Sequence, residues 1–342
     1  MVKYIQKTLS LLWILSLSIV VLNCGKSDNS SESKKNVRKI KITMIAKSSK
    51  NPVFLSAKQG AEQAAKALSK KHSKFDVIID WKTPPNENEN AQVDSIRKAV
   101  TEGTDAILIS CSDGPILTET INQTVADGIP VMTFDSDLPE SKRFAFYGAN
   151  DMEVGATLMD KIAELIGKKG QIAILGGNQD APNLQNRVAG VRKTSGNYPD
   201  IQIVGEYYHA ETTEDAAAKV LQVNAENPQL TGWVMVGGWP FFDDKLMDKI
   251  EPGKYQIVVV DALPEQLPYL EKEIIQMCLG QPLFKWGEVS VQQIIDYIAF
   301  EKEIEPIKNM QLIQVTTANL GGWARQLRAW GFEGLTKHYL TM

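Results

Sequence analysis

Polar and aromatic residues recur directly after the short apolar runs of this 342-residue sequence. The positions concerned are 47–54, 81–85, 111–114, 135–137, 176–183, 208–211, 237–239 and Asp261. Carboxylates and amides supply paired hydrogen-bond acceptors and donors, and aromatic faces pack on C–H surfaces. These residue types therefore favour the binding of a polar, hydroxyl-rich ligand.

The apolar runs alternate with helical patterns, and this order determines how the polar residues are positioned. We expect strands at 40–46, 75–81, 106–110 and 130–134, with helices between them at 52–68, 89–102 and 115–127. This alternation requires a parallel, doubly wound sheet with right-handed crossovers. Ligands of such sheets bind beyond the carboxyl ends of the strands, which is where the polar residues stand.

The alternation restarts after residue 148. We expect helices at 151–166, 182–193, 213–227, 242–250 and 285–300, and strands at 171–175, 201–207, 233–236, 256–260 and 274–278. Asp151 is the expected N-cap of the first of these helices. The sequence thus predicts an α/β protein with two doubly wound units that divide near residues 135–150.

Several candidate residues also have a purely structural explanation. Asp135 and Asp261 could form turns or cap helices, and Asn183 could cap the helix that begins beside it. Arg187 could form an ion pair on a helix surface, and Phe54 could belong to the hydrophobic core. These alternatives stay open on the residues alone.

Several short motifs resemble, in order and spacing, the periplasmic sugar-binding proteins of the ribose-binding and LacI superfamily. They are Asn51-Pro52-Val53-Phe54, residues 128–137, 187–191 and 258–261, and Gln281 six residues before Gly287. The resemblance covers about residues 40–317 and implies two doubly wound parallel-sheet lobes joined by a hinge, the periplasmic-binding-protein type I fold. It implies an N-terminal lobe of 40–147 plus 282–310 and a C-terminal lobe of 148–281. The C-terminus is longer than the usual end of the family, and we expect residues 311–342 to form a strap over the hinge side.

The same resemblance implies which residues contact the ligand. Asn51, Phe54 and Asp135 contact it from the first lobe, with Phe54 stacked on a sugar ring. Arg187 and Asp261 contact it from the second lobe; an arginine fork binds two adjacent hydroxyls, and a carboxylate accepts from them. The expected ligand-binding set also includes Lys47, Asp137, Asn183, Trp239 and, near the hinge, Gln281.

Two departures from the family pattern bear on the ligand. Val53 replaces an aromatic residue, and Gly237 and Gly238 stand where the family usually has Asn-Asp. The indole of Trp239 could rebuild a stacking wall or pack within its loop. Lys47 corresponds to a lysine of autoinducer-2-binding relatives, but Arg187 stands where those relatives tend to have Trp, which favours a ring sugar or polyol.

The N-terminus is typical of an exported, lipid-anchored protein. Two lysines precede an apolar run at 9–22, and the pattern predicts a signal peptide at 1–23. The following Cys24 resembles the lipidated cysteine of a bacterial lipobox, although Asn23 departs from the usual small residue. Residues 24–39 are mostly polar and predict a flexible tether. There are two alternatives. One is a plain signal peptide with an incidental cysteine, and the other is a single membrane anchor.

Composition and the absence of motifs exclude several other classes. The formal net charge of −4 and the lack of a basic stripe argue against nucleic-acid binding. The three cysteines and three histidines have no metal-ligand spacing, so we expect neither a metal nor a cofactor. No nucleophile elbow or phosphate loop is visible, and we expect no catalysis.

The sequence therefore predicts a solute-binding lipoprotein of the bacterial cell envelope, periplasmic or surface-exposed. We expect a monomer that binds a small sugar or polyol and delivers it to an ABC-type permease. One alternative is a sensory protein for a chemoreceptor or histidine kinase, and another is an autoinducer-2-type binder. A transcriptional repressor would need an N-terminal helix-turn-helix where the signal peptide and tether stand.

Overall fold

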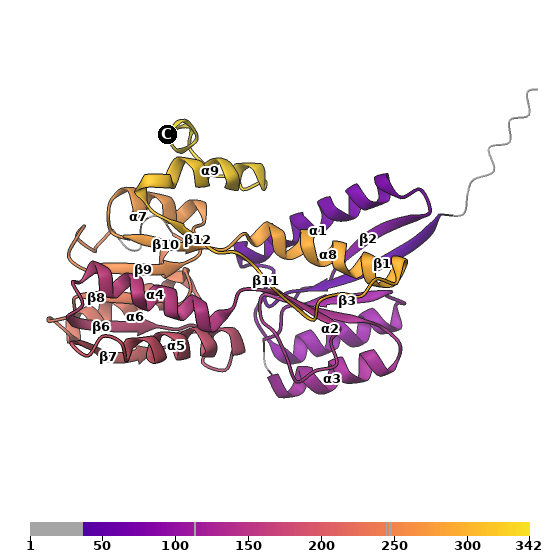
Figure 1. Ribbon diagram of the computed structural model, residues 1–342, viewed down its shortest axis with the longest axis horizontal. Helices are drawn as coiled ribbons and strands as arrows, with labels where there is room; N and C mark the ends of the chain where they lie inside the picture. The colour runs from indigo at the N-terminus through magenta and orange to yellow at the C-terminus, as the bar shows by residue number, and fades with distance from the viewer. Residues whose placement is uncertain (1–36, 113, 244, 246–247) are drawn as a thin grey trace, which may run out of the picture. The chain divides into compact units, whose positions relative to one another are not determined.

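Two six-stranded sheets, each flanked by helices, organise the chain (Figure 1). The computed structural model describes residues 37–112, 114–243, 245 and 248–342. The predicted signal peptide, Cys24 and most of the predicted tether lie outside these residues. Within them, no helix combines the length and apolar character needed to cross a membrane.

The first sheet has the strand order β11-β5-β4-β3-β1-β2, and every neighbouring pair is parallel. Its strands are β1 (Arg38–Ile45), β2 (Phe75–Trp81), β3 (Ala106–Ile109), β4 (Val131–Phe134), β5 (Ala145–Gly148) and β11 (Ile307–Asn309). Helices α1 (Pro52–Lys71) and α8 (Leu283–Phe300) cover one face, and α2 (Glu89–Thr101) and α3 (Gly114–Ala126) cover the other (Figure 1). We call this half the N lobe.

The second sheet has the order β12-β10-β9-β8-β6-β7 and is parallel except for β12, which is antiparallel to β10. Its strands are β6 (Gly170–Leu175), β7 (Ile201–Tyr207), β8 (Gly232–Met235), β9 (Gln256–Val260), β10 (Met277–Gly280) and β12 (Ile313–Val315). Its helices are α4 (Asp151–Leu165), α5 (Pro182–Ser195), α6 (Thr213–Glu226), α7 (Leu267–Glu271), α9 (Leu320–Ala329) and α10 (Lys337–Thr341). We call this half the C lobe.

Strand periodicity sorts the core residues of each sheet onto its two faces. In β6, Ile172 and Ile174 belong to the hydrophobic cluster that includes α4 and α5, whereas Ala173 and Leu175 belong to the cluster that includes α6 and α9. Successive side chains of a strand point to opposite faces, so a strand covered on both sides reads as a continuous apolar run. This burial holds the polar strand ends in place.

The chain passes between the two sheets three times, after β5, after β10 and after β11. Gln281 and Pro282 form the second of these connections. Residues 283–309 therefore return to the N lobe, whereas β12 and the helices after it complete the C lobe. Three neighbouring connections are the geometry in which two lobes rotate about a hinge.

Two expectations about local structure are wrong. Asn150, rather than Asp151, caps α4, because its side chain accepts from the backbone N–H of Glu153 at 3.3 Å. The expected helix at 242–250 is replaced by a short 3-10 turn (Trp239–Phe241), followed among the described residues by bends and turns. A buried aromatic pair, Phe241 against Tyr269 with ring centroids 5.1 Å apart, anchors that turn in the core.

Paired glycines allow the closest helix crossing in each lobe. A Cβ on Gly60 of α1 would fall on the carbonyl oxygen of Phe284, and one on Gly287 of α8 would fall on that of Ala57. In the C lobe, a Cβ on Gly155 of α4 would meet the backbone of Arg187 in α5. Backbone against backbone leaves no room for a methyl group, so these positions require glycine.

We predict that Gly287→Ala lowers the free energy of unfolding by about 3 kcal/mol, because the added methyl group forces α1 and α8 apart. Chemical denaturation of the purified protein measures the change. Gly322→Ala in α9 is the matched control, since its new Cβ would have only a side-chain atom of Arg325 nearby, at 3.9 Å. The control should be neutral or stabilising by up to about 1 kcal/mol; equal losses in both variants would contradict the close-packing explanation.

Candidate functional site

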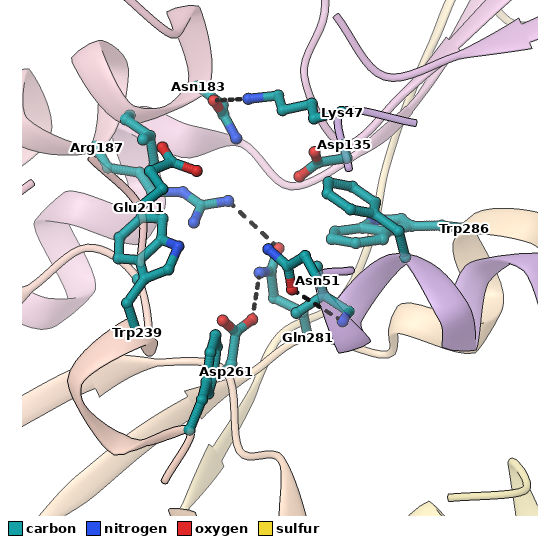
Figure 2. Close-up of a pocket in the computed structure, with 15 residues that line it drawn as sticks. Lys47, Asn51, Asp135, Asn183, Arg187, Glu211, Trp239, Asp261, Gln281 and Trp286 are labelled. Atoms are coloured by element: carbon teal, nitrogen blue, oxygen red, sulfur yellow. Dashed lines mark hydrogen bonds between the residues drawn. The ribbon is translucent and has the colours of Figure 1, made fainter. Parts of the chain in front are cut away.

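A polar cavity lies between the carboxyl ends of the two sets of strands (Figure 2). Every residue of the expected ligand-binding set except Asp137 lines it. The lining residues are Lys47, Asn51, Val53, Phe54, Asp135, Asn183, Leu184, Arg187, Glu211, Gly237, Trp239, Phe242, Asp261, Gln281 and Trp286. The strand-end pattern in the sequence therefore predicted the position of the cavity.

The N lobe contributes an amide, a carboxylate and an aromatic wall. Asn51 caps α1 by accepting from the N–H of Val53 at 3.1 Å, which leaves its amide NH₂ group available at the cavity. Phe54 is buried against Trp286, with ring centroids 6.2 Å apart and an angle of 27° between the rings. Phe54 packs in the core and also lines the cavity, while its contact with a ligand stays a prediction.

Asp135 has a backbone conformation that aims its carboxylate into the cavity. It follows β4 with φ of 58°, in the left-handed region that costs a non-glycine residue energy. The hydroxyl of Ser110 at the end of β3 donates to Asp135 Oδ2 at 2.7 Å. One carboxylate oxygen is fixed by the protein, and the other is free to accept from a ligand.

The C lobe places a buried guanidinium, that of Arg187, opposite the aromatic wall. Arg187 is 4% exposed. Its Nε donates to Asp151 at 2.7 Å, Nη1 to the carbonyl of Val236 at 3.0 Å, and Nη2 to Gln281 at 3.4 Å. A guanidinium has five N–H donors, so one donor on each terminal nitrogen remains for a ligand. The ion pair with Asp151 also explains why Asp151 does not cap its own helix.

Asp261 mirrors Asp135 at the end of β9. Its φ is 72°, and its carboxylate accepts from Gln281 Nε2 at 2.9 Å. Burial raises the pKa of Asp261, and the bond from Gln281 and the charge of Arg187 oppose that shift. Arg187, Gln281 and Asp261 thus form one hydrogen-bonded chain along the cavity (Figure 2).

A second polar cluster joins the two lobes at the other side of the cavity. Lys47, which follows β1, donates to Asn183 Oδ1 of the C lobe at 3.1 Å and lies 3.9 Å from Glu87. Burial disfavours the charge of Lys47, but Glu87, Asp135 and Glu211 outweigh this effect and raise its pKa overall. Lys47 therefore carries a positive charge in contact with both lobes.

Glu211 of the C lobe belongs to this cluster and was missing from the expected set. Burial, together with the charge of Glu87 and against that of Lys47, raises the pKa of Glu211 to about 8. The backbone N–H of Asn178 donates to its Oε1 at 2.8 Å. Glu211 lies within the strand-end segment 208–211, so the pattern located it, but no motif singled it out.

Trp239 lines the cavity as a buried ring, 7% exposed. The imidazole of His209 packs edge-on against it, with ring centroids 4.9 Å apart. Burial lowers the pKa of His209 to about 4, so this imidazole is neutral at physiological pH. The tryptophan therefore serves the packing of its loop and the cavity wall at the same time.

Asp137 is not brought to the cavity. Its carboxylate pairs with Arg143 and accepts from Thr133 Oγ1 at 2.6 Å and from the N–H of Leu138 at 2.8 Å. This half-buried ion pair holds the side chain of Asp137 within the N lobe, and Asp137 does not line the cavity. Trp286, which was not in the expected set, packs in the core and also lines the cavity.

Neither of the two cysteines in the described residues lines this site. Cys111 and Cys278 are free and buried, and burial raises the pKa of each thiol. Across 37–112, 114–243, 245 and 248–342, no group of three or more His, Cys, Asp or Glu side chains could hold a metal ion. The predicted lipidation site, Cys24, is outside the described residues.

Two parallel-sheet lobes with a polar cavity between their strand ends define a binding protein of the two-lobed α/β class. Residues 42–302 match the family model of the periplasmic binding protein domain, and the chain belongs to that family. The fold confirms the predicted architecture of two doubly wound lobes.

Individual relatives are more distant. The chain is 26% identical over 183 residues to the ribose import binding protein of Bacillus subtilis, covering 54% of this chain and 56% of that protein. It is 25% identical over 214 residues to a xylitol-binding protein of Mycolicibacterium smegmatis, covering 62% and 57%. The chain thus spans somewhat more than half the length of these curated relatives.

A solved structure matches over a longer stretch. An ABC transporter solute-binding protein from Burkholderia graminis, in complex with D-arabinose, superposes with a TM-score of 0.77 at 26% identity. The match covers 83% of this chain and 98% of that one. Both lobes are therefore shared with that protein.

Proposed function

We propose that this protein binds a small sugar or polyol between its lobes and delivers it to an ABC-type permease, without converting it chemically. The observation that carries the proposal is the meeting of Asp135, Asp261 and Arg187 in one cavity. Two carboxylates accept from hydroxyl groups, and the arginine donates to adjacent hydroxyls or a ring oxygen. These three side chains match the surface of a polyhydroxylated ligand.

The aromatic residues of the cavity support a ring-shaped or extended carbon skeleton. Phe54 and Trp286 line the cavity from the N lobe, and Trp239 lines it from the C lobe. Aromatic faces pack against the C–H faces of sugars, while the polar groups around them bind the hydroxyls. The ligands of the relatives, namely ribose, xylitol and D-arabinose, are of this chemical class.

Binding from both lobes gives the ligand a way to favour one conformation. A ligand that contacts Asp135 and Arg187 together interacts with both lobes, so it stabilises the closed form relative to an open one. The permease is then the partner that distinguishes the closed form. We propose that the protein acts as a monomer. The family name supports a location in the periplasm or elsewhere in the cell envelope.

Isothermal titration with D-ribose, D-arabinose, D-xylose, xylitol and D-glucose tests the proposal. We expect at least one to bind, and Asp135→Ala and Arg187→Ala each to weaken that binding at least tenfold, or about 1.4 kcal/mol. Asp137→Asn is the matched control, because this carboxylate is two residues from Asp135 but pairs with Arg143. The affinity of the Asp137→Asn variant should stay within twofold of that of the unmodified protein. No binding by any of the five compounds would refute the sugar proposal.

The pKa of Glu211 predicts a pH dependence of that binding. In this structure, in which Lys47 joins the two lobes through Asn183, the pKa is raised to about 8 from an ordinary value of 4.5. Lobe separation removes Glu87 and restores solvent, so closure takes up a proton between these two pH values. Affinity should therefore fall as pH rises through this window, by up to about tenfold per unit, and level off above it.

Titration calorimetry between pH 5.5 and 8.5 measures this dependence, and Glu211→Gln should flatten it because an amide does not titrate. Glu214→Gln serves as control, since Glu214 is an exposed acid three residues away. That control should keep the slope of the unmodified protein. An identical slope in Glu211→Gln would assign the pH dependence to another group.

We also propose that Cys24 carries a lipid that anchors the protein to a membrane. The support is the order of positive residues, apolar run and cysteine at the N-terminus. Metabolic labelling with an alkyne fatty acid should label the full-length protein in a bacterial host, and Cys24→Ala should abolish the label. Retention of label in that variant would contradict the proposal.

A further inference from the structure

Trp323 lies directly behind the cavity, in the C-terminal segment to which sequence reasoning assigned no function. It belongs to α9, and its side chain is 5% exposed within the core that also contains Val259 of β9 and Cys278 of β10. It does not line the cavity. Its contacts nevertheless fall on the backbone of the two strands whose ends carry Asp261 and Gln281.

Two contacts connect Trp323 to these strand ends. Its indole N–H donates to the carbonyl of Ala262, the residue after Asp261, at 2.7 Å. Its ring covers Gly280, the residue before Gln281, so closely that a Cβ on Gly280 would lie 3.0 Å from two ring atoms. One side chain thus touches the immediate neighbours of both members of the Asp261–Gln281 hydrogen bond.

The backbone at Asp261 needs such support. The left-handed φ of 72° is costly for an aspartate and persists only where surrounding contacts hold it. The carbonyl of Ala262 is in a residue only 2% exposed, and a buried carbonyl without a partner is unfavourable. The side chain of Gln266 accepts from the backbone N–H of Leu263 at 2.8 Å. Trp323 donates to the carbonyl of Ala262, which lies between Asp261 and Leu263 in the sequence.

Trp323 is itself fixed from behind. The ring of Trp330 packs edge-on against it with centroids 5.6 Å apart, and Trp330 stacks on Phe284 of α8 at 6.3 Å. The three rings form a column from the start of α8 to the end of β9. Because the ring of Trp323 is tightly packed on both sides, it restricts the movement of the backbone that it contacts.

We propose that Trp323 is a positioning residue for ligand binding: through Ala262 and Gly280 it holds Asp261 and Gln281 in the geometry that receives the ligand. This proposal rests on the proposed function and adds to it a role for the C-terminal segment. The residue acts through the backbone and does not touch the ligand. Loss of its N–H should therefore act on binding through Asp261.

Trp323→Phe is the informative variant, because it keeps an aromatic ring and removes the indole N–H. Trp233→Phe is its matched control: Trp233 lies in the same hydrophobic cluster and donates its indole N–H to Asn224 at 2.9 Å, away from the cavity residues. With the tightest binder among the five compounds above, we expect Trp323→Phe to weaken binding about tenfold. Trp233→Phe should stay within twofold although both variants lose stability.

A double-mutant cycle separates positioning from general destabilisation. In an Asp261→Ala background, Trp323→Phe should change affinity less than twofold, because the group that it positions is gone. A tenfold loss in that background as well, or equal losses for Trp323→Phe and Trp233→Phe, would overturn the proposal. Unchanged affinity in Trp323→Phe would also overturn it.

Hydrogen–deuterium exchange without any sugar provides a second readout that does not depend on the proposed function. Amides at 261–263 and 279–281 should exchange at least tenfold faster in Trp323→Phe and unchanged in Trp233→Phe. If none of the five compounds binds the unmodified protein, the sugar proposal fails while this readout still decides the positioning role. Should Trp323→Phe not fold, Gly280→Ala, which displaces the same ring, takes its place with the same expectations.

Discussion

The neutralisation of one buried guanidinium is the constraint on which the binding site depends. Arg187 is almost fully enclosed, and an unpaired charge in that position would cost several kcal/mol. Asp151 supplies the direct ion pair at 2.7 Å, and Asp135 and Asp261 add favourable charge from both lobes. The pairing requires α4 and α5 to approach until their backbones touch, which Gly155 and Gly190 permit. The close packing of α4 against α5 thus determines how the charge of Arg187 in the cavity is neutralised.

The same constraint explains how the cavity is divided. On one side, Arg187, Gln281 and Asp261 bond to one another and leave their remaining donors and acceptors for a ligand. On the other side, Lys47, Glu87 and Glu211 bring charges from both lobes together. Arg187 and Asp261 both belong to the C lobe, whereas Gln281, which joins them, belongs to the hinge connection. The second group is complete only where the lobes meet, because Lys47 and Glu87 belong to the N lobe and Glu211 to the C lobe.

Sequence patterns predicted the alternation of strands and helices and the edge at which the site lies, because both follow from local periodicity. The remaining features depend on contacts between residues that are far apart in the sequence. Asn150 and Asp151 are equally good caps locally, and only the distant Arg187 assigns Asp151 to an ion pair. Asp135 and Asp137 are the same residue type, but Asp137 pairs with Arg143, whereas Asp135 lines the cavity. Glu211 and Trp286 become lining residues only once two lobes are brought together, which no local signal describes.

Gln281 occupies a connection between the lobes and also takes part in the hydrogen-bonded chain of the site. Any rotation of the lobes must twist the backbone at 280–283, and this twist moves the amide that joins Arg187 to Asp261. The connection between the lobes and the hydrogen-bonded chain of the site therefore share one residue, Gln281. A ligand bound as proposed would therefore act on the hinge through Gln281 directly, without a relay of intermediate side chains.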